Sequence, residues 1–143
     1  MKIVLSCDHG GYKLKESVKG LLSEAGMDFE DYGVFDEKPA DYPEIAARVC
    51  AAIKDGRFAR GILICGTGVG MSIAANRFSG IRAALCGDEF SARMSREHND
   101  ANVLCLGGRT IGPGLALLIT RSWLETEFTG GRHTRRLAMI DKT

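Results

Sequence analysis

The chain has 143 residues, of which 45% are hydrophobic and 26% are charged, and its formal net charge is +1. This length suits one domain with a substantial core, and the composition is that of a soluble globular protein. Because the net charge is near zero, it gives no general bias toward nucleic acid or membranes, and any basic site must be local.

The first residues do not have the pattern of a signal peptide. Their apolar stretch is shorter than the roughly 7–15 residues of a signal-peptide core, and Asp8 and His9 follow at once. No apolar run approaches the about 20 residues that span a bilayer. We interpret residues 2–7 as a first strand and expect a cytoplasmic protein that does not associate with membranes.

Strand-like and helix-like segments then alternate along the chain. Residues 12–25 carry apolar side chains at a spacing of three to four, which predicts a helix. A weak strand over 27–31 follows, and then a helix capped by Asp41 with Pro43 in its first turn. The remaining predicted elements are a strand over 61–65, a helix over 71–77, a strand over 81–86, a helix over 88–96, a strand over 103–106, a helix over 113–127 and a basic segment 130–143 with helical propensity.

This alternation with short connections predicts a five-stranded parallel sheet covered by helices on both faces. The expected fold class is a single-domain, doubly wound α/β protein, flavodoxin-like or Rossmann-like, that spans residues 1–143. Ligands bind to such sheets beyond the carboxyl ends of the strands. Polar residues and glycines concentrate at those ends, after residues 7, 65, 86 and 106.

The apolar run 62–64 ends in Cys65 and a glycine-rich loop, the most informative part of the sequence. Glycines at 66, 68 and 70 allow backbone N–H groups to surround an anion just past the strand, where a thiolate is also stabilised. The loop is not a P-loop, because no Gly-Lys-Ser/Thr follows. Met71 occupies the place of the third glycine of a dinucleotide fingerprint. A nucleotide site and a tight turn without a ligand stay open as alternatives.

The five cysteines, at 7, 50, 65, 86 and 105, never approach Cys-x-x-Cys spacing. This argues against a zinc site or a redox dithiol, and the odd number argues against a closed disulfide framework. Most of them are interpreted as small buried apolar residues. Only Cys65 has neighbours that favour chemistry.

Polar residues at other segment ends are further candidates. Asp8 and His9 follow the first strand, which lies beside the third in a flavodoxin-like order; in the plainer interpretation Asp8 only caps a turn. His98 closes a predicted helix and suits proton transfer near neutrality. A histidine at a helix end is, however, more often a partner of the helix dipole.

The C-terminal segment contains a dense basic cluster, which an ordinary solvated tail would also explain. On a helix, Arg132 and Arg136 share a face, and this spacing suits a guanidinium clamp on one phosphate. Arg109, just past the fifth strand, could join them. Nucleic-acid binding is not expected, because the patch is short and lacks interleaved aromatic residues.

Seven segments together carry a resemblance to a known family. They are Cys-Asp-His at 7–9, Asp-Tyr-Pro at 41–43, Gly-Ile-Leu-Ile-Cys-Gly-Thr-Gly-Val-Gly at 61–70, Ser-Ile-Ala-Ala-Asn at 72–76, Gly-Ile-Arg-Ala at 80–83, Ser-Arg-Glu-His-Asn-Asp-Ala-Asn-Val-Leu at 95–104 and Gly-Gly-Arg-His at 130–133. In this order and over most of the chain, they resemble the type B ribose-5-phosphate isomerases within the wider ribose, galactose and allose phosphate isomerase family. No departure falls at a position that matters for the chemistry.

The resemblance implies interconversion of ribose 5-phosphate and ribulose 5-phosphate through an enediolate, without a cofactor or a metal. Cys65 would be the base, Thr67 would orient groups near it, and His98 would assist opening of the furanose ring. The amides expected to stabilise the enediolate oxygen belong to the loop of Gly66, Thr67, Gly68, Val69 and Gly70. The expected sugar-binding residues are Asp8, Tyr42 and Asn99, and the expected phosphate-binding residues are His9, Arg109, Arg132 and Arg136.

In the family the pocket lies between two subunits, so the resemblance implies a homodimer or a tetramer, with segment 130–143 completing the site. The expected ligand is a phosphorylated sugar. One alternative is an isomerase of a six-carbon substrate, allose 6-phosphate or galactose 6-phosphate. Another, from a different class, is a non-catalytic regulator that binds a sugar phosphate or a nucleotide, against which the joint presence of Cys65, Thr67 and His98 argues. Whether Cys7 and Cys65 can form a disulfide is left open.

Overall fold

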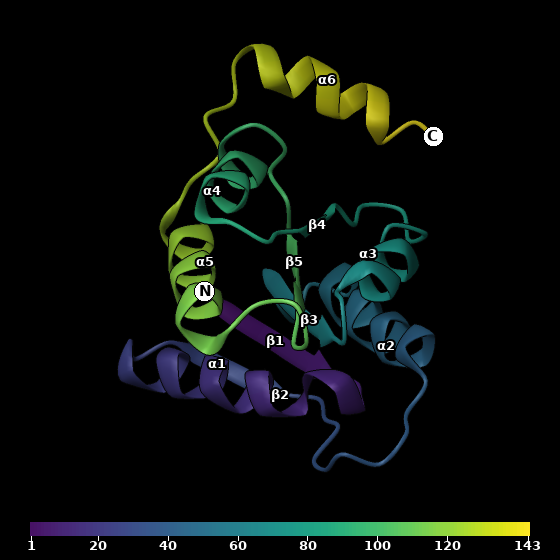
Figure 1. The fold of residues 1–143 in the computed structure, drawn as a ribbon. Helices are drawn as coiled ribbons and strands as arrows, with labels where there is room; N and C mark the ends of the chain where they lie inside the picture. The colour runs from purple at the N-terminus through teal and green to yellow at the C-terminus, as the bar shows by residue number, and fades with distance from the viewer.

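The computed structural model describes all 143 residues and contains one parallel sheet with strand order β2-β1-β3-β5-β4 (Figure 1). The strands are β1 (Lys2–Cys7), β2 (Asp28–Asp31), β3 (Arg60–Cys65), β4 (Ala83–Leu85) and β5 (Val103–Gly107). The helices are η1 (His9–Gly11, a 3-10 turn), α1 (Tyr12–Glu24), α2 (Tyr42–Lys54), α3 (Val69–Ala75), α4 (Glu89–Glu97), α5 (Pro113–Glu125) and α6 (Arg132–Ile140). The predicted fold class, a doubly wound five-stranded α/β protein, is confirmed.

The strand order departs from the flavodoxin order 2-1-3-4-5 at one edge, because β5 lies between β3 and β4. The burial of the two strands gives the physical reason. All five residues of β5 are buried, as an interior strand requires. The three residues of β4 are half-buried or exposed, as an edge strand allows. The predicted neighbours β1 and β3 do pair, in parallel.

Two apolar cores lie on the two faces of the sheet, because successive side chains along a strand point to opposite sides. Ile62 and Ile64 of β3 belong to the core shared with α1 and α5. Leu63 and Cys65 belong to the core shared with α2 and α3. Cys7 lies in the first core, so the thiols of Cys7 and Cys65 are on opposite faces of the sheet.

Helix α6 stands apart from the rest of the molecule. In Figure 1 it lies beyond α4, at the end of the sheet where β5 begins, and only Leu137 of the helix is buried. The predicted helical propensity of the basic segment therefore produces a helix, but one that packs little against the sheet. Its free faces are available for contacts outside the chain.

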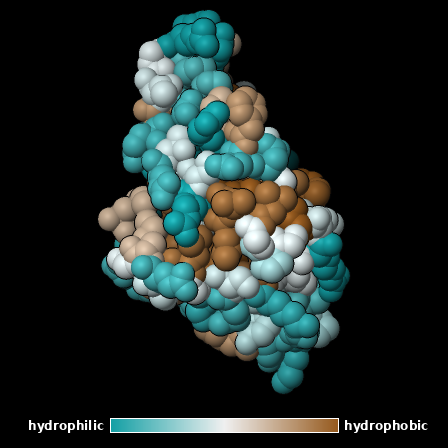
Figure 2. All heavy atoms as spheres, turned by 60° about the vertical axis from the view of Figure 1, so that its left-hand side comes forward, coloured by the Kyte–Doolittle hydropathy of each residue, from teal (hydrophilic) through white to brown (hydrophobic).

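The surface combines polar and apolar areas. Figure 2 shows an apolar patch in the middle of one face, with a hydrophilic projection above it. The exposed apolar side chains of the molecule include Leu115 and Leu118 of α5 and Ile73 of α3. None of the helices has the length and apolar character that crossing a membrane requires.

Candidate functional site

Three loops meet at the carboxyl end of the sheet, where the glycine-rich sequence follows β3. The backbone N–H of Gly108 donates to the carbonyl of Cys65 at 2.8 Å, and that of Arg109 donates to the carbonyl of Gly66 at 2.9 Å. A Cβ atom at Gly10 would lie 2.9 Å from the backbone nitrogen of Gly66. The glycines are therefore required by close backbone approach between the loops, which side chains would prevent.

Cys65 is 5% exposed and its sulfur faces the turn that leads into α3. The backbone N–H of Gly68 donates to Cys65 Sγ at 3.1 Å. Gly68 has φ of +77°, a conformation that favours glycine, and a Cβ atom there would lie 2.5 Å from Leu85 Cδ1. The hydrogen bond and the packing around Gly68 fix the position of the Cys65 sulfur at the start of the turn.

The loop that follows Cys65 contains further backbone amides. Thr67 Oγ1 accepts a hydrogen bond from the N–H of Val69 at 3.2 Å. The N–H groups of Gly66, Thr67 and Gly70 have no hydrogen-bond partner within the chain. The loop thus offers unpaired donors beside a thiol, an arrangement suited to stabilising negative charge on a bound oxygen.

The remaining thiols have a different environment. Burial raises the pKa of Cys7, Cys50 and Cys86 to about 11 in each case. Burial also raises the pKa of Cys105 well above its ordinary value. These four cysteines remain protonated at neutral pH and act as core residues, as their sequence context predicts.

Asp8, His9, Tyr42 and Arg109 are brought to the same loops. Asp8 is 6% exposed and accepts a hydrogen bond from the N–H of Gly10 at 2.8 Å, so it does cap the turn. His9 Nδ1 accepts from the N–H of Ala40 at 3.2 Å, which leaves Nε2 free to face a ligand. The Tyr42 ring covers Gly70, where a Cβ atom would lie 2.8 Å from it, and the Arg109 side chain lies over Gly66.

A buried ion pair holds the start of the segment that carries Ala40, the residue whose N–H binds His9. Lys15, with a fully buried side chain, donates to Asp31 Oδ1 at 2.8 Å, and Lys19 Nζ lies 3.0 Å from Asp31 Oδ2. Although burial alone would raise it, the pKa of Asp31 is lowered by the hydrogen bonds from Lys15, the Gly33 N–H and Lys19. These contacts fix the start of the loop that leads to Ala40.

Four predicted site residues lie elsewhere. His98 and Asn99 follow α4, which runs back from the end of β4 toward the start of the strands. The N–H of Gly61, near the start of β3, donates to the carbonyl of Asn102 at 2.8 Å. Arg82, just before β4, donates from Nε to the carbonyl of Asn99 at 3.0 Å. His98 and Asn99 are therefore at the amino end of the sheet, opposite Cys65.

Helix α6 belongs to this second location. The rings of His98 and His133 are stacked, with centroids 4.3 Å apart and planes 15° from parallel. Loss of hydration in this stack lowers the pKa of His133, and the charges of His98, Arg132 and Arg136 lower it further. Arg132 and Arg136 are exposed on the same helix.

The predicted site residues thus form two groups that one chain does not bring together. We call the residues at the carboxyl end the thiol half-site; they are Asp8, His9, Tyr42, Cys65, Gly66, Thr67, Gly68, Val69, Gly70 and Arg109. We call those at the amino end the basic half-site; they are His98, Asn99, Arg132 and Arg136. Gly61 and Cys65 are four residues apart on β3, which corresponds to about 13 Å along the strand.

Within one chain Arg109 lies with Cys65, apart from Arg132 and Arg136. The clamp of all three arginines on one phosphate stays a prediction that requires residues from two copies of the chain. The sequence interpretation missed Arg82, whose ion pairs connect the parts of the basic half-site. The only signal was a charged residue inside the predicted strand 81–86. The chain contains no group of three or more His, Cys, Asp or Glu placed to hold a metal ion.

Comparison with known proteins identifies the family of the chain. The family model described as Ribose/Galactose Isomerase matches residues 3–140. The chain is 47% identical to "Ribose-5-phosphate isomerase B" of Escherichia coli, over 97% of this chain and 93% of that protein. It is 45% identical to "D-erythrulose-4-phosphate isomerase" of Pectobacterium atrosepticum, over 98% and 93% of the two chains.

A solved structure gives the same result for the fold. The ribose-5-phosphate isomerase B of Clostridium thermocellum superposes with a TM-score of 0.97 at 50% identity, covering 99% of this chain and 96% of that one. Matches of this extent and identity establish the family as well as the architecture. The chain therefore belongs to the ribose/galactose isomerase family and is a sugar-phosphate isomerase.

Proposed function

We propose that this isomerase interconverts D-ribose 5-phosphate and D-ribulose 5-phosphate, with Cys65 as the base. The observation that carries the proposal is the Cys65 sulfur, held by the Gly68 N–H beside loop amides that have no partner in the chain. The relatives from Escherichia coli and Clostridium thermocellum carry this activity in their names, which supports the same substrate here.

The reaction moves one proton between neighbouring carbons. The Cys65 thiolate removes the proton from C2 of the open-chain aldose, and the electron pair forms an enediolate. The thiol then returns this proton to C1 while the hydroxyl proton of O2 passes to O1, which gives the ketose with its carbonyl at C2. A carbon acid is far weaker than a thiol, so the donors that face the enediolate oxygen supply most of the barrier reduction. Each well-placed donor contributes about 3–4 kcal/mol, and the N–H groups of Gly66, Thr67 and Gly70 are available.

The other residues bind and orient the substrate. His98 assists opening of the furanose ring by proton transfer. Asp8 and Asn99 hold hydroxyl groups or the reacting oxygens, and Tyr42 lines the pocket. His9, Arg109, Arg132 and Arg136 hold the phosphate, which is remote from the reacting carbons and supplies positioning energy. All these steps use protein groups, without a cofactor.

The two half-sites must come from different copies of the chain, because one chain places them at opposite ends of its sheet. We infer a homodimer, or a tetramer built from it, in which the basic half-site of one copy faces the thiol half-site of another. Two exposed apolar side chains on α3 support this contact, Val69 within the thiol half-site and Ile73 further along the helix. An interface between identical copies would cover them.

The first experiment compares metal-stripped wild type with Cys65→Ala in conversion of ribose 5-phosphate to ribulose 5-phosphate. Turnover by wild type that is lost in the variant supports both the reaction and its base. Cys50→Ala is the matched control, because this cysteine is also buried but lies on α2. Substantial turnover by Cys65→Ala would exclude Cys65 as the base.

The second experiment tests the shared site by mixing two variants that each lose turnover. Cys65→Ala and His98→Asn, one from each half-site, are unfolded together and refolded as mixed oligomers. If the half-sites come from different copies, a mixed dimer contains one intact site and activity returns. If each site belongs to a single chain, no combination is intact and the mixture stays as inactive as its components.

The second candidate function is isomerisation of a sugar phosphate with a different number of carbons. One relative at 45% identity is named for a four-carbon phosphate, and the family name includes galactose. A competition panel of four-, five- and six-carbon aldose phosphates decides, by the ratio of kcat/KM values. Binding of these sugars without turnover of any of them would instead support a regulator.

A further inference from the structure

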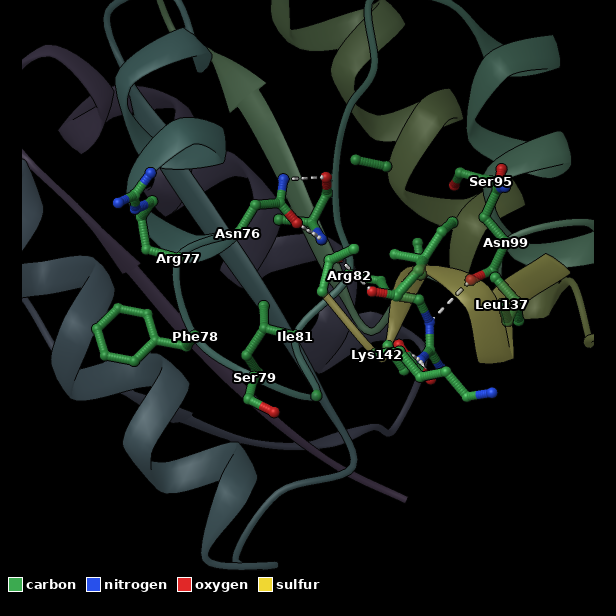
Figure 3. Close-up of a pocket in the computed structure, with 17 residues that line it drawn as sticks. Asn76, Arg77, Phe78, Ser79, Ile81, Arg82, Ser95, Asn99, Leu137 and Lys142 are labelled. Atoms are coloured by element: carbon green, nitrogen blue, oxygen red, sulfur yellow. Dashed lines mark hydrogen bonds and ion pairs between the residues drawn. The ribbon is translucent and has the colours of Figure 1, made fainter.

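A cavity of about 640 Å³ separates the C-terminal end of α6 from the segment that leads into β4. Figure 3 shows Arg82 reaching into it between Asn76 and Lys142, with Asn99 and Leu137 on the far wall. Arg82 is only partly exposed, with 20% of its side chain accessible. It touches both parts of the basic half-site, the 98–100 loop and α6.

The first set of contacts is with the loop that carries His98. Arg82 Nε donates to the carbonyl of Asn99 at 3.0 Å and to the carbonyl of Asp100 at 3.2 Å. Its Nη2 donates to Asp100 Oδ2 at 3.1 Å. Such charge-assisted bonds from a planar guanidinium fix direction as well as distance.

The second set of contacts is with the end of α6. Arg82 Nη1 lies 3.1 Å from both carboxylate oxygens of Asp141, the residue that follows the helix. Leu137 is the only buried residue of α6. The Arg82–Asp141 pair is therefore a main anchor of the helix that carries Arg132 and Arg136.

The loop itself adopts a backbone conformation that needs support. Asp100 has φ of +44°, the only residue other than glycine with a positive φ. Its carboxylate bridges two guanidinium groups, Arg82 and Arg96, the latter at 2.8 Å. Unfavourable backbone conformations persist only where neighbouring groups hold them, and these two arginines do so next to His98 and Asn99.

Arg82 is in turn held from both sides by asparagine side chains. Asn102 accepts from the Arg82 N–H at 2.8 Å and donates to the carbonyl of Gly80 at 2.8 Å. Asn76 makes the same paired contacts with the backbone of Ala83, at 2.8 and 2.9 Å. The backbone that carries the Arg82 side chain is therefore fixed, as a positioning role requires.

We propose that Arg82 is a positioning residue that fixes the His98–Asn99 loop and α6 relative to each other, so that ring opening and phosphate binding act on one substrate. This proposal rests on the proposed function, in which those groups contact the sugar phosphate. Arg82 itself touches no substrate. The two carboxylate partners of Arg82 allow its effects on α6 and on the loop to be measured separately. Asp141 anchors only α6, and Asp100 anchors only the loop.

The experiment measures kcat and KM for ribose 5-phosphate in three variants, together with hydrogen–deuterium exchange of residues 132–140. Asp141→Asn is expected to raise KM about tenfold with kcat nearly unchanged, because only the phosphate-binding helix is released. Asp100→Asn is expected to lower kcat with a smaller change in KM. Arg82→Gln is expected to change both and to accelerate exchange in α6.

Arg77→Gln is the matched control, since this arginine lines the same cavity, is exposed and forms no ion pair. Equal effects of Arg77→Gln and Arg82→Gln, or kcat and KM within about twofold of wild type in Arg82→Gln, would overturn the proposal. If Arg82→Gln does not fold, the surface variant Asp141→Asn decides through its KM. If wild type converts no sugar phosphate, the proposed function fails. The anchoring role is tested separately, because unchanged hydrogen–deuterium exchange of α6 in Asp141→Asn would overturn it.

Discussion

The sulfur of Cys65 and the backbone nitrogen of Gly68 lie 3.1 Å apart, at a point where only glycine fits. A Cβ atom at residue 68 would meet Leu85 at 2.5 Å and the backbone of Leu106 at 2.9 Å, on a backbone with φ of +77°. The donor that faces the thiol is therefore fixed by packing against β4 and β5.

Gly68→Ala is expected to move this donor and to lower kcat about a hundredfold. The clash and the positive φ should also lower the free energy of unfolding by about 2–4 kcal/mol. Steady-state kinetics and urea unfolding measure the two effects. Gly26→Ala is the control, because Gly26 also has a positive φ (+65°) but has no atom within 4 Å of its Cβ position; it should lose stability alone. Wild-type kcat in Gly68→Ala would contradict the role of the loop.

His98→Asn is expected to lose about a hundredfold in kcat on ribose 5-phosphate, the size of a general acid–base contribution. The variant should be nearly normal on a 4-deoxy aldose 5-phosphate, which has no O4 with which to close a furanose ring. This comparison isolates ring opening from the enediolate step. An equal loss on both compounds would assign His98 to the proton transfer at carbon instead.

Arg132→Gln and Arg136→Gln are expected to raise KM by about tenfold or more, with kcat within about twofold of wild type, because each removes a phosphate contact. Arg135→Gln is the control on the same helix. Its guanidinium lies 3.8 Å from Met139 Sδ, on a different face. If all three variants raise KM equally, the effect is one of general charge and the clamp is excluded.

The His98–His133 stack is expected to weaken in acid. Because the pKa of His133 is lowered in the fold from its ordinary 6.5, the unfolded chain binds the proton more readily. The stabilising contribution is therefore complete above about pH 6.5 and is lost as the pH falls below it. NMR titration of the His133 ring should give a midpoint below 6.5, and Arg136→Gln should raise that midpoint. A midpoint above 6.5 would contradict the predicted environment.

Asp31→Asn is expected to lower the free energy of unfolding by about 3 kcal/mol, because it leaves the buried ammonium of Lys15 without its carboxylate. Glu30→Gln on the neighbouring residue is the control. It breaks an exposed pair with Lys2 and should cost less than about 1 kcal/mol. If urea unfolding gives equal losses of unfolding free energy for Asp31→Asn and Glu30→Gln, the buried Lys15 pair is no more important for stability than the exposed Lys2 pair.

The elements of the fold could be predicted because each depends on a local apolar pattern. The predicted strand at 103–106 appears as β5 (Val103–Gly107) and the helix at 12–25 as α1 (Tyr12–Glu24). The position of β5 between β3 and β4 could not be predicted from the pattern alone, since it depends on which strand is buried on both faces. The predicted strand at 81–86 shortens to Ala83–Leu85, because the side chain of Asn102 binds the backbone of Gly80 and Arg82.

For the candidate site too, only part of the arrangement could be predicted from the sequence. Cys65, Thr67 and Gly68 are close in sequence, so their grouping could be predicted from the loop. The separation of His98 from Cys65 depends on the direction of α4, which returns to the amino end of the sheet. Arg82 could not be identified, because its partners Asp100 and Asp141 are 18 and 59 residues away.

Cys7 and Cys65 occupy adjacent strands but opposite faces of the sheet, and this arrangement determines how the molecule responds to an oxidant. Cys105 shares the face of Cys65 but is set back by two residues on β5, which places their Cα atoms about 8 Å apart, beyond disulfide reach. Neither strand neighbour can therefore rescue a Cys65 sulfenic acid as a disulfide. A Cys65 sulfenic acid that no other thiol captures is converted by further peroxide to sulfinic acid, which thiols do not reduce.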